Sequence, residues 1–289
     1  MKTLTGLIIF LFLCLAGISA QAQTPFELYD DFNSDFLDIE KWTTGERRDT
    51  GVMILDTVRE LHGGRLRVMG RAFGNTVTVP NPPPPPAPLG VRAGDVNASF
   101  HMWEAVQGLK VSVKVNDVEV AGCPGSNTYP TYARARFAGF FFNSAVDPPS
   151  TPTDRTGDVL AQIRIQRRSD SVDRAQVLEV FADVFRCSDA PCINASGPLP
   201  AFLGSILLGQ WATIEMDWDV DHSGFNFSIN KESTVFVQYP WFVYRLSAPG
   251  NINTLGVSHR LANCPMDERA MGFMDAEFEN LLVRELPSP

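Results

Sequence analysis

Residues 211–230, WATIEMDWDVDHSGFNFSIN, carry the pattern that decides the fold class. Every second position of the first half belongs to one set: Trp211, Thr213, Glu215, Asp217 and Asp219. Apolar Ile214, Met216 and Trp218 occupy positions between them. Successive side chains of a β-strand point to opposite faces, so this alternation predicts a strand with one apolar face. The turn-forming residues 221–224 lead into a second strand-like segment, 225–230, and together they predict a β-hairpin.

The same period of two recurs along the rest of the chain, whereas helical periodicity is almost absent. β-Branched and aromatic residues gather in short segments between turn formers. Each such segment predicts a strand: 52–58, 66–73, 109–115, 133–143, 159–166, 177–185, 234–238, 254–258 and 273–284. A run of strands without intervening helices predicts a sandwich or a barrel.

A proline-rich stretch, residues 80–88, interrupts this pattern. Residues 82–86 are all proline, which predicts polyproline II because proline cannot donate to a β-ladder. The stretch fits either a linker between domains or a loop within one domain. Residues 23–79 offer too few strands for a comfortable core of their own. We therefore expect one domain over 23–289, with 80–88 as a loop.

The N-terminus has the parts of a secretory signal peptide over residues 1–22. Lys2 supplies a positive end, residues 7–15 are uninterruptedly apolar, and Ala20-Gln21-Ala22 resembles a cleavage site. The apolar segment is shorter than the roughly 20 residues that a spanning helix needs. We expect a secreted, periplasmic or otherwise extracellular protein that does not insert into a membrane.

Four cysteines follow the signal peptide: Cys123, Cys187, Cys192 and Cys264. An even number in an exported chain predicts two disulfides. Cys187 and Cys192 are close enough to close a small loop, which leaves Cys123 with Cys264. The alternative is a zinc site, but the spacings lack a C-x-x-C pair and the histidines are scattered.

The chain is acidic, with a formal net charge of −9, and has no stripe of lysine and arginine. This composition argues against nucleic acid or an anionic membrane as the partner. Nucleophile-elbow, zinc-protease, phosphate-loop and dinucleotide motifs are also missing from the sequence, so we expect no organic cofactor. The oligomeric state stays open.

Both ends of the chain resemble a known superfamily. Residues 29–33, YDDFN, followed by Lys41-Trp42, resemble the opening strand of concanavalin A-like lectin/glucanase domains, a group with laminin-G-like jelly rolls. Residues 275–283, DAEFENLLV, resemble the closing strand, and 211–230 resemble the hairpin before it. The resemblance implies a jelly-roll sandwich of two antiparallel sheets, in which the first and last strands pair.

Glu215, Asp217 and Asp219 resemble the E-x-D-x-E catalytic strand of laminarinase-type glycoside hydrolases, with Asp in the last position. Retaining glycosidases hold two carboxylates about 5–5.5 Å apart. Positions i and i+4 of a strand are about 13 Å apart, so long side chains would have to converge. The alternative is the polar outer face of an amphipathic strand.

The resemblance also implies a structural Ca²⁺ between the first and last strands. The matching positions are Asp31 and Glu279, with backbone carbonyls near Gly45, because hard oxygen ligands suit this ion. Glu279 stands where the superfamily usually has Asp. The alternative is a pair of solvated edge carboxylates.

A basic and polar cluster spans two predicted strands: Arg134, Arg136, Arg164, Gln166 and Arg168. Side by side, such strands would line a groove. The set resembles jelly-roll polysaccharide lyases, which use Arg, Gln-x-His and Tyr, but Gln162-Ile163-Arg164 has Arg in place of the His base. A solvated face and a site for an anionic glycan both remain open.

Tyr239 and Trp241 flank Pro240, which interrupts the strand pattern. Exposed aromatic rings stack on sugar rings, so these two are candidates for ligand binding, with core packing as the alternative.

We expect a non-catalytic module that binds a polysaccharide, another glycan or another extracellular ligand. The alternatives are a glycan-degrading enzyme (a laminarinase-like hydrolase, or less readily a lyase) and a structural or adhesive protein.

Overall fold

The computed structural model describes residues 24–43, 47–49, 53–77, 91–102, 105–123, 129–147, 151, 154–171, 176–192, 194–248, 252–265 and 269–286. Within these residues eight strands form one antiparallel sheet. Their order across the sheet is β16, β15, β14, β8, β19, β5, β4, and β1 pairs with β19. Its strands are β1 (Glu27–Asp30), β4 (Met53–Leu61), β5 (Leu66–Phe73), β8 (Val106–Ala121), β14 (Trp211–Asp219), β15 (Gly224–Ile229), β16 (Ser233–Gln238) and β19 (Met271–Glu285).

A second antiparallel sheet contains nine strands of the described residues, ordered β12, β11, β10, β9, β17, β7, β2, with β13 beside β11 and β3 beside β7. Its strands are β2 (Trp42–Thr43), β3 (Arg47–Asp49), β7 (Val91–His101), β9 (Tyr132–Asn143), β10 (Asp158–Arg168), β11 (Val177–Cys187), β12 (Ala195–Ser196), β13 (Ala201–Leu207) and β17 (Ile252–Ala262). The short strands β6 (Thr76–Val77) and β18 (Cys264–Pro265) form a small parallel pair.

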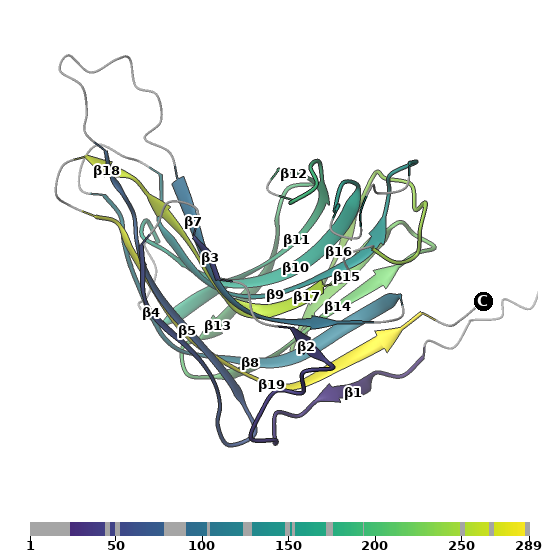
Figure 1. Ribbon diagram of the computed structural model, residues 1–289, viewed down its shortest axis with the longest axis horizontal. Helices are drawn as coiled ribbons and strands as arrows, with labels where there is room; N and C mark the ends of the chain where they lie inside the picture. Colours follow the sequence, from purple (N-terminus) through teal and green to yellow (C-terminus); the bar gives the residue numbers. More distant parts are fainter. Residues whose placement is uncertain are drawn as a thin grey trace, which may run out of the picture.

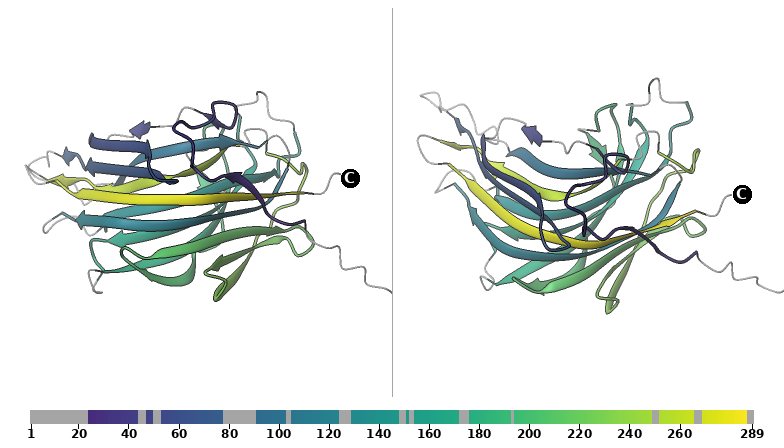
Figure 2. Two further views of the ribbon diagram at one scale, coloured as in Figure 1. Left: turned by 90° about the horizontal axis from the view of Figure 1, so that it is seen from below. Right: turned by 60° about the horizontal axis from the view of Figure 1, so that its bottom comes forward.

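The two large sheets lie face to face and bend together, with the nine-stranded sheet on the inner side of the bend (Figure 1). Apolar side chains from both sheets meet between them. Fully buried examples are Phe100, Phe137, Leu109, Trp218 and Phe278. Figure 2 shows the two layers from other sides, with β19 running along the outer sheet. The predicted all-β sandwich of two antiparallel sheets is confirmed.

The first and last strands pair, as the resemblance implied. Glu27 lies opposite Val283, and Leu28 lies opposite Leu282. Strands from before and after the proline stretch share both sheets, since β5 pairs with β19 and β2 pairs with β7. The predicted signal peptide, residues 1–22, and the proline stretch itself, 80–88, lie outside the described residues.

Both predicted disulfides are present. Cys123 bonds Cys264 across a sequence separation of 141 with Cα atoms 5.3 Å apart. Cys187 bonds Cys192 with Cα atoms 4.8 Å apart and closes a small loop after β11. The zinc alternative is therefore wrong, because all four sulfurs are consumed in covalent bonds.

The sequence analysis did not predict five strands of the nine-stranded sheet: the short β2, β3 and β12, and the longer β7 and β13. β7 contains Gly94, Asp95 and Asn97, which are poor strand formers, although Val96, Ala98 and Phe100 alternate as a strand requires. β13 is interrupted at Gly204, which has a φ of 140° beside a register shift against β11. Tertiary pairing on both sides of β7 outweighs its local propensity.

Candidate functional site: the inner face of the nine-stranded sheet

The candidate site is built on the strand β10, whose two faces differ in kind. Four apolar side chains point into the core: Val159, Ala161, Ile163 and Ile165, each no more than 1% exposed. Gln162, Arg164 and Gln166 alternate with them and therefore point to the inner face of the bend. A polar row thus runs along the middle strand of this face.

The register of β10 with β9 brings the predicted arginine cluster together. Arg136 lies directly opposite Arg164, and Arg134 lies opposite Gln166. Arg168 lies opposite Tyr132, and both Arg134 and Arg168 place their guanidinium groups over the Tyr132 ring, 4.6 and 5.4 Å from its centroid. These residues therefore line one surface, as the two-strand prediction required.

A carboxylate from the next strand neutralises one of these arginines. Asp183 of β11 accepts hydrogen bonds from Arg164 Nε at 2.6 Å and Arg164 Nη2 at 3.2 Å, and from Gln162 Nε2 at 2.9 Å. Arg164 also donates to Gln166 Oε1. Both charged side chains are buried, so Arg164 is committed to Asp183. It is not a solvated surface residue.

Arg134 and Arg136 are different. Within the described residues neither forms an ion pair, and the Nε atom of each is buried without a hydrogen-bond partner. Arg136 Nη2 donates one long hydrogen bond within the described residues, 3.5 Å, to Thr254 Oγ1. Burial, together with the nearby positive charges of Arg164 and Arg260, lowers the pKa of Arg134 to about 9. Arg134 and Arg136 therefore lack an ion-pair partner among the described residues, whereas Arg164 pairs with Asp183 and Arg168 pairs with Asp170.

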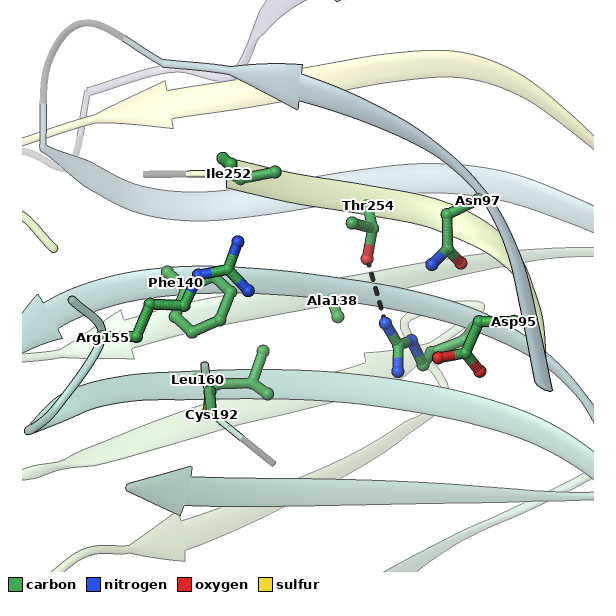
Figure 3. A pocket seen from close by; sticks show the side chains of 10 residues that line it. Asp95, Asn97, Ala138, Phe140, Arg155, Leu160, Cys192, Ile252 and Thr254 are labelled. Atoms are coloured by element: carbon green, nitrogen blue, oxygen red, sulfur yellow. Dashed lines mark hydrogen bonds between the residues drawn. The ribbon is translucent and has the colours of Figure 1, made fainter. Parts of the chain in front are cut away.

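A pocket opens on this face between β7, β17, β9 and β10 (Figure 3). Ala138 forms its floor, and apolar Phe140, Leu160 and Ile252 form one end. The polar lining residues are Asp95, Asn97, Arg136, Arg155 and Thr254. Cys192 of the small disulfide loop completes the wall, and the backbone N–H of Arg155 donates to Ala190 O of the same loop.

Aromatic side chains lie on the same face as the arginines, but they are not the predicted ones. Phe181 of β11 faces Phe202 of β13 edge to face, with centroids 5.4 Å apart, and Arg164 lies over the Phe181 ring at 4.9 Å. Phe202 is 54% exposed. An apolar ring is thus available beside the basic row.

Tyr239 and Trp241 do not form an exposed platform. Tyr239 is buried in the core, where its hydroxyl accepts a hydrogen bond from Trp218 Nε1 at 2.9 Å. Trp241 stacks on Tyr239 and is half-buried against the same core. Pro240 interrupts the ladder, yet the chain still turns these rings inward because Trp218 and Phe142 offer apolar partners there.

The acidic strand residues lie on the opposite side of the molecule. Alternation on β14 places Glu215, Asp217 and Asp219 on the outer face of the eight-stranded sheet, because Ile214, Met216 and Trp218 fill the core. Glu215 pairs with Lys110 at 3.2 Å, and Asp217 pairs with Arg284 at 2.8 Å. Asp219 accepts from the backbone N–H of His222.

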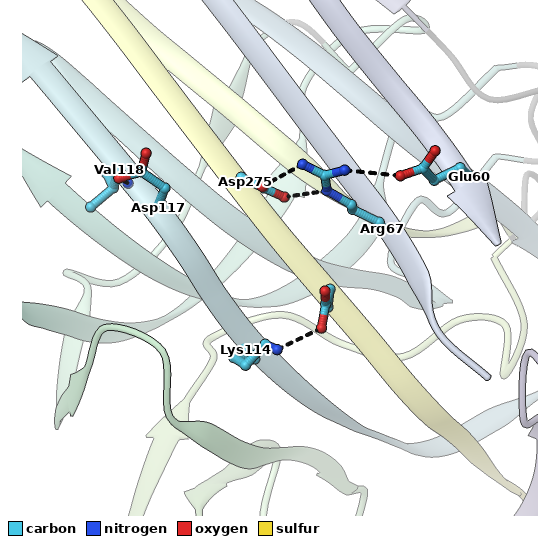
Figure 4. A network of polar contacts seen from close by, with 7 residues as sticks. Glu60, Arg67, Lys114, Asp117, Val118 and Asp275 are labelled. Atoms are coloured by element: carbon cyan, nitrogen blue, oxygen red, sulfur yellow. Dashed lines mark hydrogen bonds and ion pairs between the residues drawn. The ribbon is translucent and has the colours of Figure 1, made fainter. Parts of the chain in front are cut away.

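These pairs belong to a ladder of charges along the outer face. In Figure 4, Arg67 bridges Glu60 and Asp275, and Lys114 makes a separate ion pair, to Glu277. Opposite charges on neighbouring strands stabilise such a sheet face, and Asp217, Asp275 and Arg284 are themselves buried in it. The carboxylates of β14 thus have protein partners on this face, and the laminarinase-like interpretation of this strand stays a prediction.

The two predicted calcium ligands among the described residues, Asp31 and Glu279, have protein partners. Glu279 pairs with the cation Arg65 at 3.5 Å, while Asp31 accepts a hydrogen bond from the backbone N–H of Asn33. Among the described residues no three acidic, histidine or cysteine side chains gather as a metal site. The backbone near Gly45, which the prediction also includes, lies outside the described residues. Calcium stays a prediction, which melting curves recorded with Ca²⁺ and with a chelator would test.

Sequence reasoning missed part of the pocket. Asp95 and Asn97 come from β7, a strand that was not predicted, and Arg155 comes from the turn before β10. The apolar alternation of Val96, Ala98 and Phe100 was the available signal for the first two. Nothing local marks Arg155, because only the folded disulfide loop brings it to the pocket.

Comparison with known proteins adds similarity at the level of fold. No model of a protein family matches the chain, and the search of curated proteins found no match. Among solved structures, an endo-acting O-glycanase structure from the human gut microbiota is 11% identical, covering 89% of this chain and 93% of that chain, with a TM-score of 0.41.

Two further structures are similar. LamAcat from Zobellia galactanivorans is 12% identical over 89% of this chain and 96% of that chain, with a TM-score of 0.38. Lectin UEA-II with galactose is 9% identical over 83% and 96%, with a TM-score of 0.27. The predicted resemblance to lectins and glucanases is confirmed in this sense. At these scores it carries no further argument, so function has to be argued from the site.

Proposed function

We propose that this protein binds an acidic polysaccharide along the inner face of its nine-stranded sheet, without cleaving it. The observation that supports the proposal is the pairing of Arg136 with Arg164 across β9 and β10, with Arg134 beside them. Like charges directly opposite each other destabilise a sheet. A bound anion would offset that cost, and Asp183 offsets it only for Arg164.

The charge is local. The whole chain is acidic, with a net charge of −9, so a polyanion is repelled by most of the surface. Arg134, Arg136 and exposed Arg260 concentrate positive charge on one face of the bend. Guanidinium groups form planar, paired hydrogen bonds with carboxylates, which matches the acid groups of a uronate chain.

The aromatic edge of the same face suits a sugar ring. Phe181 and Phe202 lie next to the arginine row and leave an exposed ring surface. The apolar side of a pyranose stacks on such a ring while its acid group reaches a guanidinium. Charge and ring surface together favour a carbohydrate over a small inorganic anion.

Extracellular binding accords with the covalent chemistry of the chain. Two disulfides persist in oxidising compartments, where polysaccharides also occur. No helix able to cross a membrane occurs in the part of the chain that the structure describes. With the predicted signal peptide, these observations support a secreted or periplasmic protein.

Calorimetric titration of the full chain tests the proposal. We expect polygalacturonate or alginate to bind, a neutral β-glucan not to bind, and affinity to fall as salt rises. Arg134→Met should weaken binding at least about tenfold, since a hydrogen bond to a charged group contributes about 1.5–3 kcal/mol. Arg71→Met, which removes a cation from the outer face, is the matched control.

Two results would overturn the proposal. One is equal or no binding of acidic and neutral chains. The other is product release, because new reducing ends or unsaturated sugars in the same incubations would make the protein an enzyme. If no glycan binds at all, recovery of a protein partner would favour the adhesive alternative.

A further inference from the structure

The pocket in Figure 3 combines features that the basic face as a whole does not have. Arg136 enters it with a buried Nε atom that has no hydrogen-bond partner in the described residues. Asn97 is only 3% exposed, and its side-chain oxygen also has no hydrogen-bond partner among those residues. Buried polar atoms without partners are costly, so each such atom calls for an explanation.

We propose that this pocket is a subsite for one acidic sugar residue of the bound chain, an inference that rests on the proposed function. Arg136 holds the acid group of that residue. Asn97 and Thr254 hydrogen-bond its hydroxyl groups, and the ring lies against Phe140 and Leu160.

The backbone explains why a hollow exists here. Gly256 of β17 lies between Asn97 and Arg136 in the register, and Ala138 is the next inner-facing residue on β9. A Cβ atom on Gly256 would lie 2.3 Å from Asn97 Oδ1, so no larger residue fits without displacing Asn97. Small side chains at 138 and 256 leave space above the strands that the larger residues around them enclose.

The lining matches the two sides of a sugar. Phe140, Leu160 and Ile252 give an apolar surface at one end, where the Arg155 guanidinium lies over the Phe140 ring at 5.0 Å. Asn97, Thr254 and Asp95 provide hydrogen-bonding groups at the other end. The Asp95 carboxylate can accept hydrogen bonds from sugar hydroxyl groups. A pyranose has an apolar face and a rim of hydroxyls, whereas sulfate or phosphate has no apolar face.

Competition with single sugars tests the subsite. The full chain is bound to polygalacturonate, and galacturonate or glucuronate is added, each beside its neutral counterpart, galactose or glucose. We expect an acidic monosaccharide to displace the polymer at a concentration at least about tenfold below that of its neutral counterpart. Direct titration with the same monosaccharides provides a readout that does not depend on the polymer.

Variants separate the subsite from the rest of the face. Arg136→Met and the pocket-filling Leu160→Trp should abolish competition by the monosaccharide. Arg136→Lys, which keeps the charge without the planar fork, should restore it in part. Arg134→Met should weaken the polymer at least about tenfold and leave monosaccharide affinity within about twofold. Melting curves establish that each variant is folded.

The two proposals fail in different ways. Polymer binding without competition or direct binding by any monosaccharide overturns the subsite and leaves the proposed function standing. An equal loss of monosaccharide binding in Arg134→Met and Arg136→Met also overturns it. Absence of polymer binding to the unaltered protein overturns both.

Discussion

Arg164 and Asp183, on the neighbouring strands β10 and β11, form a forked ion pair with Nε 2.6 Å from Oδ2 and Nη2 3.2 Å from Oδ1. The pair lies in the proposed glycan-binding face, and the Asp183 side chain is only 1% exposed. Because Gln162 donates to the same carboxylate, Asp183 orients two side chains of the face at once.

Removing one partner of this pair should destabilise the protein. Asp183→Asn leaves the Arg164 charge buried without compensation, which costs about 3–5 kcal/mol for buried pairs. Denaturant unfolding measures the loss. The double variant Arg164→Met with Asp183→Leu should recover much of the stability, because it removes both buried charges. Equal stability of the single variant and the unaltered protein would contradict the assignment of a buried ion pair.

Asp158 should make stability depend on pH. Its side chain is fully buried beside Asn143, and burial raises the pKa of this carboxyl to about 7, against the lesser opposing effects of the Asn143 hydrogen bond and of Arg155 and Arg245. The folded pKa is above the ordinary 3.8. The folded state therefore holds the proton more tightly, and this stabilisation is present below about pH 4 and lost as pH rises to about 7.

Asp158→Asn isolates that contribution. The amide does not titrate, so we expect the variant to gain about 1–3 kcal/mol over the unaltered protein at pH 8 and to lose this advantage at pH 4. Urea unfolding at both pH values measures it. The quantity to compare is the difference in unfolding free energy between the variant and the unaltered protein at each pH. Asp170 and Glu277 have lowered pKa values, so they stabilise both proteins as pH rises, and the difference cancels their contribution. A constant difference across pH would contradict a titrating Asp158.

The two disulfides should contribute unequally to stability. Cys123–Cys264 closes a loop of 141 positions, for which the chain-entropy model gives about 4–5 kcal/mol. Replacing both cysteines by alanine should lower the free energy of unfolding by about that amount. The matched Cys187→Ala, Cys192→Ala variant, in which the separation is only 5, should lose less stability and more ligand affinity, because Cys192 lines the pocket.

Tyr239→Phe should affect stability but not binding. It removes the Tyr239 hydroxyl, which accepts the hydrogen bond that Trp218 Nε1 donates within the described residues, and an unsatisfied buried donor costs about 1–3 kcal/mol. Thermal unfolding and polygalacturonate titration of the same variant separate the two effects. A loss of affinity at unchanged stability would return Tyr239 to the ligand-binding surface.

The sequence by itself determined the covalent and periodic features of this protein. Alternation of side chains predicted most strands, including the inner-sheet strands that carry Arg134 and Arg164, and cysteine spacing predicted both disulfides. Strand periodicity depends on residues near in sequence, and four cysteines allow only a few pairings. Local patterns are therefore enough to predict both features.

Tertiary structure alone decided which of those patterns meet at a site. Period two gives a strand two faces, but it does not say whether a polar face lines the inner side of a bend or lies on its outer surface. Glu215 and Arg164 alternate in the same way, yet β14 and β10 belong to different sheets, so one faces outward and the other lies in the proposed binding face. Likewise Asn97, Arg136 and Arg155 come from separate segments, and only the packing of β7, β9 and the disulfide loop brings them to one pocket. The physical reason is that strand pairing and sheet stacking are set by long-range burial, which a single segment of sequence does not contain.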